Sequence, residues 1–173
     1  IVAGNFTESY LAKEGHKGFG GVNLLEKIQT TLLSALYGCM LAGVDFVTMG
    51  AGISREIPGV LDALSRNQEA TMRLSVDGAV AEDGFVARFN PKRYMPGVLK
   101  LSIFQAVVSS KIFATTLAKK STGNVDGSST EGPSAGRIHD PSPSSRSQTS
   151  HCDPSHASNV AVDLEKIPTL GLP

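Results

Sequence analysis

The chain has 173 residues, 40% hydrophobic and 18% charged, which is enough for one globular domain with a sizeable core. Its 16 basic and 16 acidic side chains cancel, which argues against the basic surface that nucleic-acid binding requires. No apolar run approaches the roughly 20 residues of a membrane span. The two cysteines, Cys39 and Cys152, lie too far apart in sequence for a disulfide framework or a paired metal site. We therefore predict a cytoplasmic protein without nucleic-acid or membrane partners.

The amino-terminal part is predicted to contain a strand end, a loop and a long helix. Residues 2–10 are predicted as the end of a strand, followed by a short helical turn that Gly15 closes. A glycine-rich loop around His16 comes next. From Leu24 to Met40 apolar residues recur every four positions, which predicts a helix with a broad apolar face packed on a sheet.

A strand, a glycine turn and a helix follow one another at residues 43–64. An apolar, β-branched run ends in Gly50, Ala51 and Gly52, and Pro58 then stands where a helix begins. Ligands of α/β proteins bind at the carboxyl ends of such strands. Glycines there allow the backbone to approach a flat or phosphorylated ligand. The alternative is a βα turn that binds no ligand and needs glycine only because its backbone has positive φ.

The middle of the chain is predicted to contain an excursion and a second βα unit. Two short antiparallel strands are predicted within residues 72–89, with a turn at Asp77-Gly78. Residues 101–108 are predicted as a core strand that ends at Ser109 and Ser110. Residues 111–120 are predicted as the helix that follows, so that residues 1–120 form one α/β segment.

The last third has a different composition. Ser, Pro, Gly, Thr and Asp dominate residues 121–159, and Ser128, Ser129 and Thr130 give a strand there nothing to bury. Such a segment does not offset its ordering entropy, so we predict loop or disorder. Residues 160–173 are predicted as a short helical segment, and the chain stops before the next strand.

The last third also contains a cluster of His and Cys residues that resembles a metal site in composition. A structural zinc site commonly needs four ligands on ordered backbone, and this cluster offers three in a serine-rich segment. We therefore predict solvated side chains rather than metal ligands at His151, Cys152 and His156.

Five stretches carry a family resemblance: GVNLLEKIQ (21–29), SALYGCMLAGVDFVTMGAGISREIPGVLD (34–62), FQAVVSS (104–110), EGPSAG (131–136) and VDLEKIPTLGLP (162–173). In this order they resemble the nitronate monooxygenase family, formerly called 2-nitropropane dioxygenases. The resemblance covers most of the chain and is strongest over residues 22–62. Enoyl reductases of fatty-acid and polyketide synthesis are similar flavoproteins and form the enzymatic alternative.

The resemblance implies a TIM barrel, present here as a truncated or degenerate part, that carries FMN. Such enzymes oxidise alkyl nitronates with O2 to a carbonyl compound and nitrite. The flavin does the redox chemistry while the protein positions it. The resemblance puts the glycine turn at the barrel mouth and the serine pair at the end of the next core strand, with a loop over the isoalloxazine. The implied FMN-binding residues are Gly50, Ala51, Gly52, Ser109, Ser110, Gly132, Ser134, Ala135 and Gly136.

The chain also departs from this family. The family's loop usually reads Ala-Gly-Gly-His, whereas this chain has Arg137 and Ile138 at the last two positions, with a histidine only at His139. His139 is therefore the candidate catalytic base, which must come within about 2.6–3.2 Å of the proton that it takes. The first barrel strand and the loops for the FMN phosphate are not found. A partial barrel has open sheet edges, which predicts self-association. The alternative from another class is a catalytically inactive structural or interaction fragment.

Overall fold

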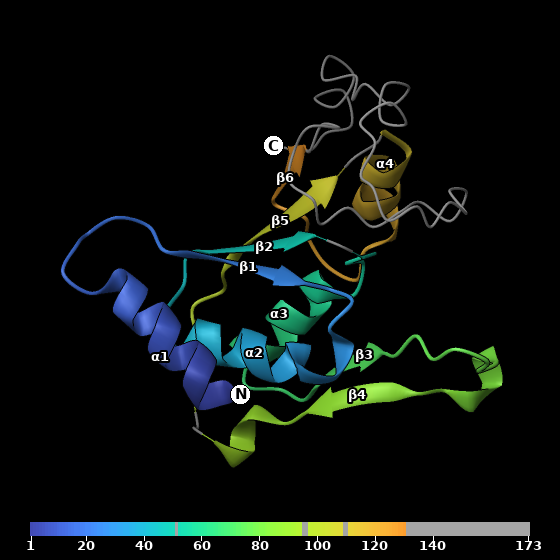
Figure 1. Cartoon of the computed structure of the whole chain (residues 1–173), viewed down its shortest axis with the longest axis horizontal. Helices are drawn as coiled ribbons and strands as arrows, with labels where there is room; N and C mark the ends of the chain where they lie inside the picture. Colours follow the sequence, from blue (N-terminus) through green and yellow to red (C-terminus); the bar gives the residue numbers. More distant parts are fainter. Residues whose placement is uncertain (51, 95–96, 109–110, 131–173) are drawn as a thin grey trace, which may run out of the picture.

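The computed structural model describes residues 1–50, 52–94, 97–108 and 111–130 (Figure 1). The α/β class is confirmed, with a four-stranded parallel sheet and a two-stranded antiparallel sheet. The elements in chain order are α1 (Val2–Lys13), β1 (Gly21–Leu25), α2 (Gln29–Leu41), β2 (Phe46–Gly50), α3 (Ile57–Ser65), β3 (Ala70–Arg73), the 3₁₀ turn η1 (Ala81–Asp83), β4 (Val86–Phe89), the 3₁₀ turn η2 (Pro91–Arg93), β5 (Ile103–Val108), α4 (Lys111–Lys120) and β6 (Gly127–Thr130).

The parallel sheet winds in one direction. Its strand order is β1-β2-β5-β6, so each strand lies beside the one before it and the order never reverses. Crossovers between parallel strands are almost always right-handed, so this order places the connecting helices on one face. βα barrels share this winding, whereas a doubly wound sheet reverses direction and carries helices on both faces.

The helix-covered face forms the core. Val47 and Met49 of β2 and Phe104, Ala106 and Val108 of β5 are buried on this face. They belong to one hydrophobic cluster with side chains of α2, α3 and α4, among them Leu36, Leu61, Leu64, Ala114 and Leu117. In Figure 1 α2 and α3 lie on the same side of β1 and β2.

The opposite face of the sheet is not covered by any described helix. The strand register aligns Asn23, Thr48 and Gln105 in one row on this face, and Thr48 Oγ1 lies 3.4 Å from Gln105 Oε1. Asn23 is exposed and the other two are half-buried. We call this the open face of the sheet.

The excursion predicted within residues 72–89 is confirmed as an antiparallel hairpin of β3 and β4, which interrupts neither β2 nor β5. Buried Met72 and Phe89 join the core cluster, and the Phe89 ring lies 5.0 Å from that of Tyr37 on α2. The hairpin therefore covers the outer side of α2. This explains why α2 is apolar nearly all round, as buried helices are.

The strand predicted for residues 2–10 is wrong, because these residues belong to helix α1. Phe6 and Tyr10 stack at 5.7 Å, as residues four apart on a helix do. Val2 packs on the core, and α1 approaches α2 so closely that a Cβ at Gly38 would lie 2.4 Å from the Val2 carbonyl oxygen. Packing on α2 thus overrides the β propensity of this segment.

The predicted helix start at Leu24 is also wrong. Leu24 and Leu25 end strand β1, which pairs in parallel with β2 along its whole length, and α2 begins only at Gln29. The four-residue spacing of Leu24, Ile28 and Leu32 therefore runs across a strand, a turn and a helix. Pairing with β2 therefore places Leu24 and Leu25 in a strand rather than in a helix.

The loop predicted for residues 121–159 is wrong at residues 127–130, which form β6 beside β5. Asp126 anchors the strand, because its backbone N–H donates to the Phe104 carbonyl at 3.1 Å and its Oδ2 accepts from the Phe104 N–H at 2.8 Å. Val125 is buried. Backbone pairing and this one carboxylate replace the missing apolar side chains. The predictions for residues 131–173, including the short helical segment, lie outside the described residues.

Candidate functional site

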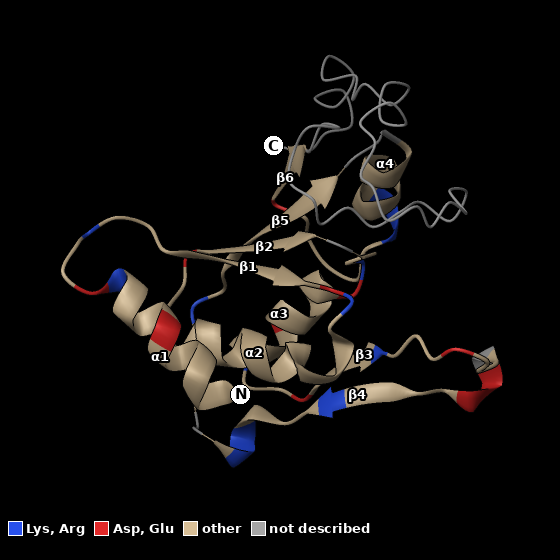
Figure 2. Cartoon of the chain, in the orientation of Figure 1, with Lys and Arg blue, Asp and Glu red and all other residues tan. Residues whose placement is uncertain are grey.

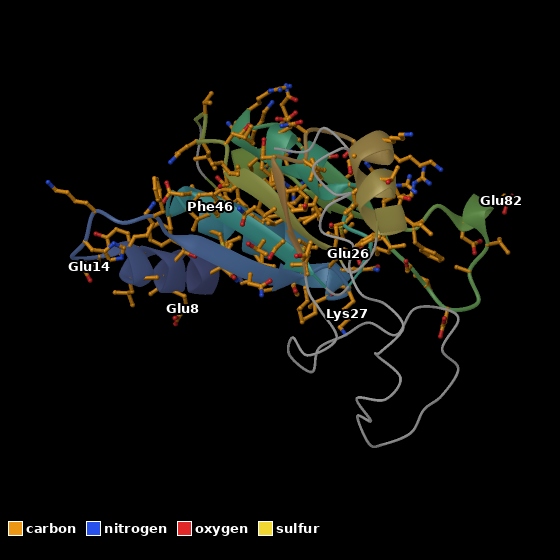
Figure 3. All side chains as sticks on the ribbon, turned by 90° about the horizontal axis from the view of Figure 1, so that it is seen from above. Glu8, Glu14, Glu26, Lys27, Phe46 and Glu82 are labelled. Atoms are coloured by element: carbon orange, nitrogen blue, oxygen red, sulfur yellow. The ribbon has the colours of Figure 1, made fainter. Side chains whose placement is uncertain are left out.

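The carboxyl ends of the parallel strands meet at one edge of the sheet. Gly50 ends β2 beside Leu25, the last residue of β1. Strands β2 and β5 pair directly, so the two predicted turns, after Gly50 and after Val108, follow neighbouring strands. Glu26 and Lys27 lie together at this end of β1, with Phe46 toward the other end of the sheet (Figure 3).

Only two of the predicted site residues are described. They are Gly50 and Gly52. The others lie outside the described residues: Ala51, Ser109, Ser110, Gly132, Ser134, Ala135, Gly136 and His139. The His151, Cys152 and His156 cluster lies outside them too.

Gly50 leaves space on the open face. A Cβ built on Gly50 would lie 3.5 Å from the nearest atom, Cβ of Val107, which is an ordinary van der Waals contact. No described atom therefore requires a glycine at this position. The missing side chain leaves room at the carboxyl edge, next to the end of β5.

Gly52 is different, because the chain itself fills the room that it makes. Its φ is +153°, a backbone conformation that favours glycine. A Cβ there would lie 2.0 Å from Oε2 and 2.8 Å from Cβ of Glu26. The Glu26 side chain thus packs against the Gly52 backbone. In this arrangement Gly52 accommodates a carboxylate of its own chain rather than a ligand.

A pocket of about 470 Å³ opens beside Gly52, between the carboxyl edge and the hairpin. Two hydrogen bonds build its wall: Arg73 N–H donates to Glu56 Oε2 at 2.8 Å, and Ser75 N–H donates to Gln29 Oε1 at 2.7 Å. The lining is mostly polar and charged. It comprises Glu26, Lys27, Gln29, Gly52, Ile53, Arg55, Glu56, Ile57, Met72, Arg73 and Ser75.

The charges around this pocket are only partly paired. The Arg73 Nε to Glu56 Oε1 distance is 3.8 Å, and Arg73 is mostly exposed, so this pair contributes little to stability. Lys27 and Arg55 form no ion pair within the described part of the chain. They leave positive charge at the pocket rim that attracts anions. The sequence did not reveal this pocket, because its walls come from three separate segments.

The N-terminus of α3 is not an open anion site. Ile57 N–H donates to the Ser54 carbonyl, Pro58 has no N–H, and Gly59 N–H donates to Thr122 Oγ1 at 3.1 Å. A free helix N-terminus binds phosphate through unpaired N–H groups. The first N–H groups of α3 are already paired with atoms of the chain.

The amino edge of the sheet is held by Asp45. This nearly buried carboxylate accepts from Lys100 Nζ at 2.6 Å, Lys13 Nζ at 2.8 Å and the Gly20 N–H at 2.9 Å. The hydrogen bonds from Lys100, then Lys13, then Gly20 hold the pKa of Asp45 well below its usual range. The cluster joins the end of α1, two loops and the start of β2. It lies at the end of the strands opposite the carboxyl edge, so it holds these elements together rather than lining the candidate site.

Other reactive groups in the described residues give no second site. Cys39 is buried on α2, and desolvation raises the pKa of its thiol, which makes it unreactive. The described ranges hold no group of three or more His, Cys, Asp or Glu side chains that could bind a metal ion. No helix among the described residues is long and apolar enough to cross a membrane.

Comparison of the chain with protein-family models, with curated proteins and with solved structures returned no match.

Proposed function

We propose that this chain is an FMN-dependent oxidoreductase of the nitronate monooxygenase type, and that its sheet is part of a TIM barrel. The proposed reaction oxidises an alkyl nitronate with O2 to a carbonyl compound and nitrite, in the cytoplasm. The observation that carries the proposal is the unfilled space at Gly50, on the open face, where β2 and β5 end side by side. The sequence resemblance supplies the cofactor and the reaction.

The sheet supports the barrel part of the proposal through its winding. A run of parallel strands in sequential order, with helices on one face, is what a segment of a βα barrel requires. Small and neutral side chains on the other face, such as Thr48 and Gly50, suit the inside of a barrel near its mouth. Active sites of such barrels are built from the loops at the carboxyl ends of the strands.

The described residues fit the flavin ring better than its phosphate. Gly50 has no Cβ to block a flat ring, and the neighbouring Val107 and Leu25 are half-buried apolar side chains that can contact it. The N-terminus of α3 offers the phosphate no free N–H group. The phosphate would therefore bind toward the pocket rim, where Lys27 and Arg55 form no ion pair with any other described side chain.

The chain's own residues would bind and orient, while bound FMN would supply the oxidation of the nitronate by O2. A nitronate is an anion, so Lys27 and Arg55 would raise its concentration near the carboxyl edge. Glu26 fixes the turn after β2 by filling the space beside Gly52. His139 remains the proposed base, and its position lies outside the described residues.

Gly50 gives the sharpest test. The chain is mixed with FMN, desalted, and its visible spectrum recorded. We expect Gly50→Val to weaken FMN retention by about tenfold or more, the factor that corresponds to roughly 1.4 kcal/mol. The matched control is Gly127→Val on β6, where a Cβ also meets only ordinary contacts but lies at the amino end of the open face. Equal effects of the two substitutions, or a colourless parent protein, would count against the flavin site.

A second candidate is a catalytically inactive chain that keeps only the fold. The Glu26 side chain in the space beside Gly52 favours it, because that space is then closed to a ligand. Oxygen-dependent release of nitrite from propyl-2-nitronate separates the two. If only the loop limits activity, Arg137→Gly with Ile138→His raises the rate of nitrite release. If both the parent chain and the double variant bind flavin but release no nitrite, the protein is either the inactive candidate or an enoyl reductase.

A further inference from the structure

We propose that the pocket between the carboxyl edge of the sheet and the hairpin is a binding site for a phosphate monoester, and that Lys27, Arg55 and Arg73 contact the phosphate. The phosphate belongs either to FMN or to a separate small ligand, and the two sources give different binding results. The proposal rests on the proposed function only where FMN is the source. The site itself follows from the walls and the charges of the pocket.

Lys27 and Arg55 stand on turns whose backbone is fixed by hydrogen bonds. Beside Lys27, the Glu26 N–H donates to the Gly50 carbonyl at 3.2 Å, which ties the turn after β1 to the end of β2. The Arg55 carbonyl accepts from the Thr122 N–H at 2.9 Å, which ties the turn before α3 to the segment after α4. The backbone of both residues is therefore in place before any ligand binds, which lowers the entropic cost of binding.

The hairpin forms the third wall of the pocket. Gln29 and Glu56 accept hydrogen bonds from the hairpin N–H groups of Ser75 and Arg73, so the hairpin is joined to the starts of α2 and α3. The Arg73 side chain is 87% exposed, and its Nε lies 3.8 Å from Glu56 Oε1. Figure 2 shows Lys and Arg in the turn after β1 and at the end of β3, on the same side of the molecule. The Arg73 guanidinium is thus free to turn toward a ligand between these segments.

The charges of the lining favour an anion with more than one negative charge. The cations Lys27, Arg55 and Arg73 stand against the carboxylates of Glu26 and Glu56. Both carboxylates already have contacts within the chain, because Glu26 packs against the turn after β2 and Glu56 accepts the Arg73 N–H. A phosphate monoester carries a charge of about −1.5 to −2 at neutral pH, and a guanidinium matches it with paired N–H donors. A phosphate therefore suits this set of cations better than a single carboxylate does.

The pocket also has room and apolar surface for the carbon part of an ester. Its volume of about 470 Å³ lies within the usual range of small-molecule sites, roughly 300–1,000 Å³. Ile57 and Met72 are buried in its lining, and Ile53 is 62% exposed. An exposed isoleucine in the same lining as the cations can contact a carbon chain or ring attached to the phosphate. This combination favours an ester over inorganic phosphate.

Phenyl phosphate tests the site without flavin. At constant ionic strength it should raise the melting temperature of the parent chain, measured by dye fluorescence, and benzoate should raise it less. Lys27→Gln with Arg55→Gln should weaken the apparent affinity for phenyl phosphate by about tenfold or more, the factor expected for a lost charge-assisted hydrogen bond. The matched control is Lys92→Gln with Lys119→Gln, two exposed lysines that do not line the pocket, and it should keep the parent's affinity. Equal melting temperatures with phenyl phosphate and benzoate, or equal losses in both double variants, would overturn the proposal.

Riboflavin, which is FMN without its phosphate, distinguishes the two sources. If FMN supplies the phosphate, the parent chain should bind FMN about tenfold or more tightly than riboflavin, and Lys27→Gln with Arg55→Gln should remove this preference. Phenyl phosphate should then also compete with FMN. If a separate ligand supplies the phosphate, phenyl phosphate binds without displacing flavin, and FMN and riboflavin bind alike.

The same measurements separate this site from the flavin proposal. A colourless chain that binds phenyl phosphate would support the phosphate site and count against the flavin. Equal binding of FMN and riboflavin, with no response to phenyl phosphate, would overturn the phosphate site and leave the flavin proposal standing.

Discussion

At the scale of single residues, Asp45 makes folding depend on pH. The pKa of this carboxyl is lower in the folded chain than its ordinary value of 3.8, mainly because Lys100 and Lys13 donate to it. The unfolded chain therefore takes up the proton first as the pH falls. The stabilisation is complete above this ordinary pKa, which applies to the unfolded chain, and is lost progressively as the pH falls toward the folded pKa.

Replacing this carboxylate should remove that dependence. We expect Asp45→Asn to lower the melting temperature at neutral pH and to flatten its decline between about pH 4 and pH 2. Thermal unfolding followed by circular dichroism across this range measures both effects. Asp126→Asn is a useful comparison, since Asp126 also accepts a backbone N–H, from Phe104, but no lysine of the described segments donates to it. An unchanged acid slope in Asp45→Asn would contradict the assignment.

At the scale of elements, the contact between α1 and α2 depends on a glycine. A Cβ at Gly38 would meet the Val2 carbonyl at 2.4 Å and the Phe6 nitrogen at 3.1 Å, both backbone atoms that cannot turn aside. We expect Gly38→Ala to push the helices apart and to cost about 1–3 kcal/mol of unfolding free energy, the usual cost of overpacking. Urea denaturation measures it.

Gly4 on α1 supplies the control for that substitution. A Cβ there has no neighbour within 4 Å, so Gly4→Ala adds helix propensity without a clash. It should stabilise the chain by roughly 0.5–1 kcal/mol, whereas Gly38→Ala should destabilise it. If both alanines shift the urea midpoint in the same direction, the close approach at Gly38 does not control this contact.

The elements also show what the sequence can predict. The sequence predicted β2, α3, the β3–β4 hairpin, β5 and α4, because apolar spacing, Pro58 and the turn at Asp77-Gly78 are local signals. It did not predict α1, β1 or β6. These depend on partners distant in the chain: α1 on its close approach to α2 at Gly38, β1 on pairing with β2, and β6 on two hydrogen bonds between Asp126 and Phe104.

The candidate site likewise has features that the sequence predicts and features that it does not. The glycine turn after β2 was predicted, and its position beside β5 follows from parallel pairing. The occupation of the space at Gly52 by Glu26 was not predicted, because it depends on how the turn after β1 folds back. The pocket was not predicted either, since Gln29, Glu56 and Ser75 come together only when the hairpin packs.

At the scale of the whole molecule, the described residues pack into one cluster that joins the hairpin to the sheet. Phe89 of β4 is 7% exposed and belongs to the cluster that contains Leu36 and Phe104. We expect Phe89→Ala to lower the free energy of unfolding by about 3–5 kcal/mol. Phe85 is in the same hairpin region but 49% exposed, so Phe85→Ala should change it by less than about 0.5 kcal/mol.

Two probes decide whether the hairpin unfolds with the sheet. Far-ultraviolet circular dichroism follows the helices and strands. In a chain with Tyr10→Phe, tyrosine fluorescence follows Tyr37 and Tyr94, which surround Phe89. A single cluster predicts coincident urea transitions for both signals in the parent chain and in Phe89→Ala. An early fluorescence transition in the parent would show that the hairpin detaches first.

The position of the hairpin over α2 also restricts how this sequence can diverge. Because the buried Tyr37 ring contacts the buried Phe89 ring, a smaller side chain at either position leaves a void that the other must fill. Substitutions in the helix and in the excursion should then be inherited as compensating pairs. A recombination that exchanged residues 70–94 alone would bring together two surfaces that were never selected to fit.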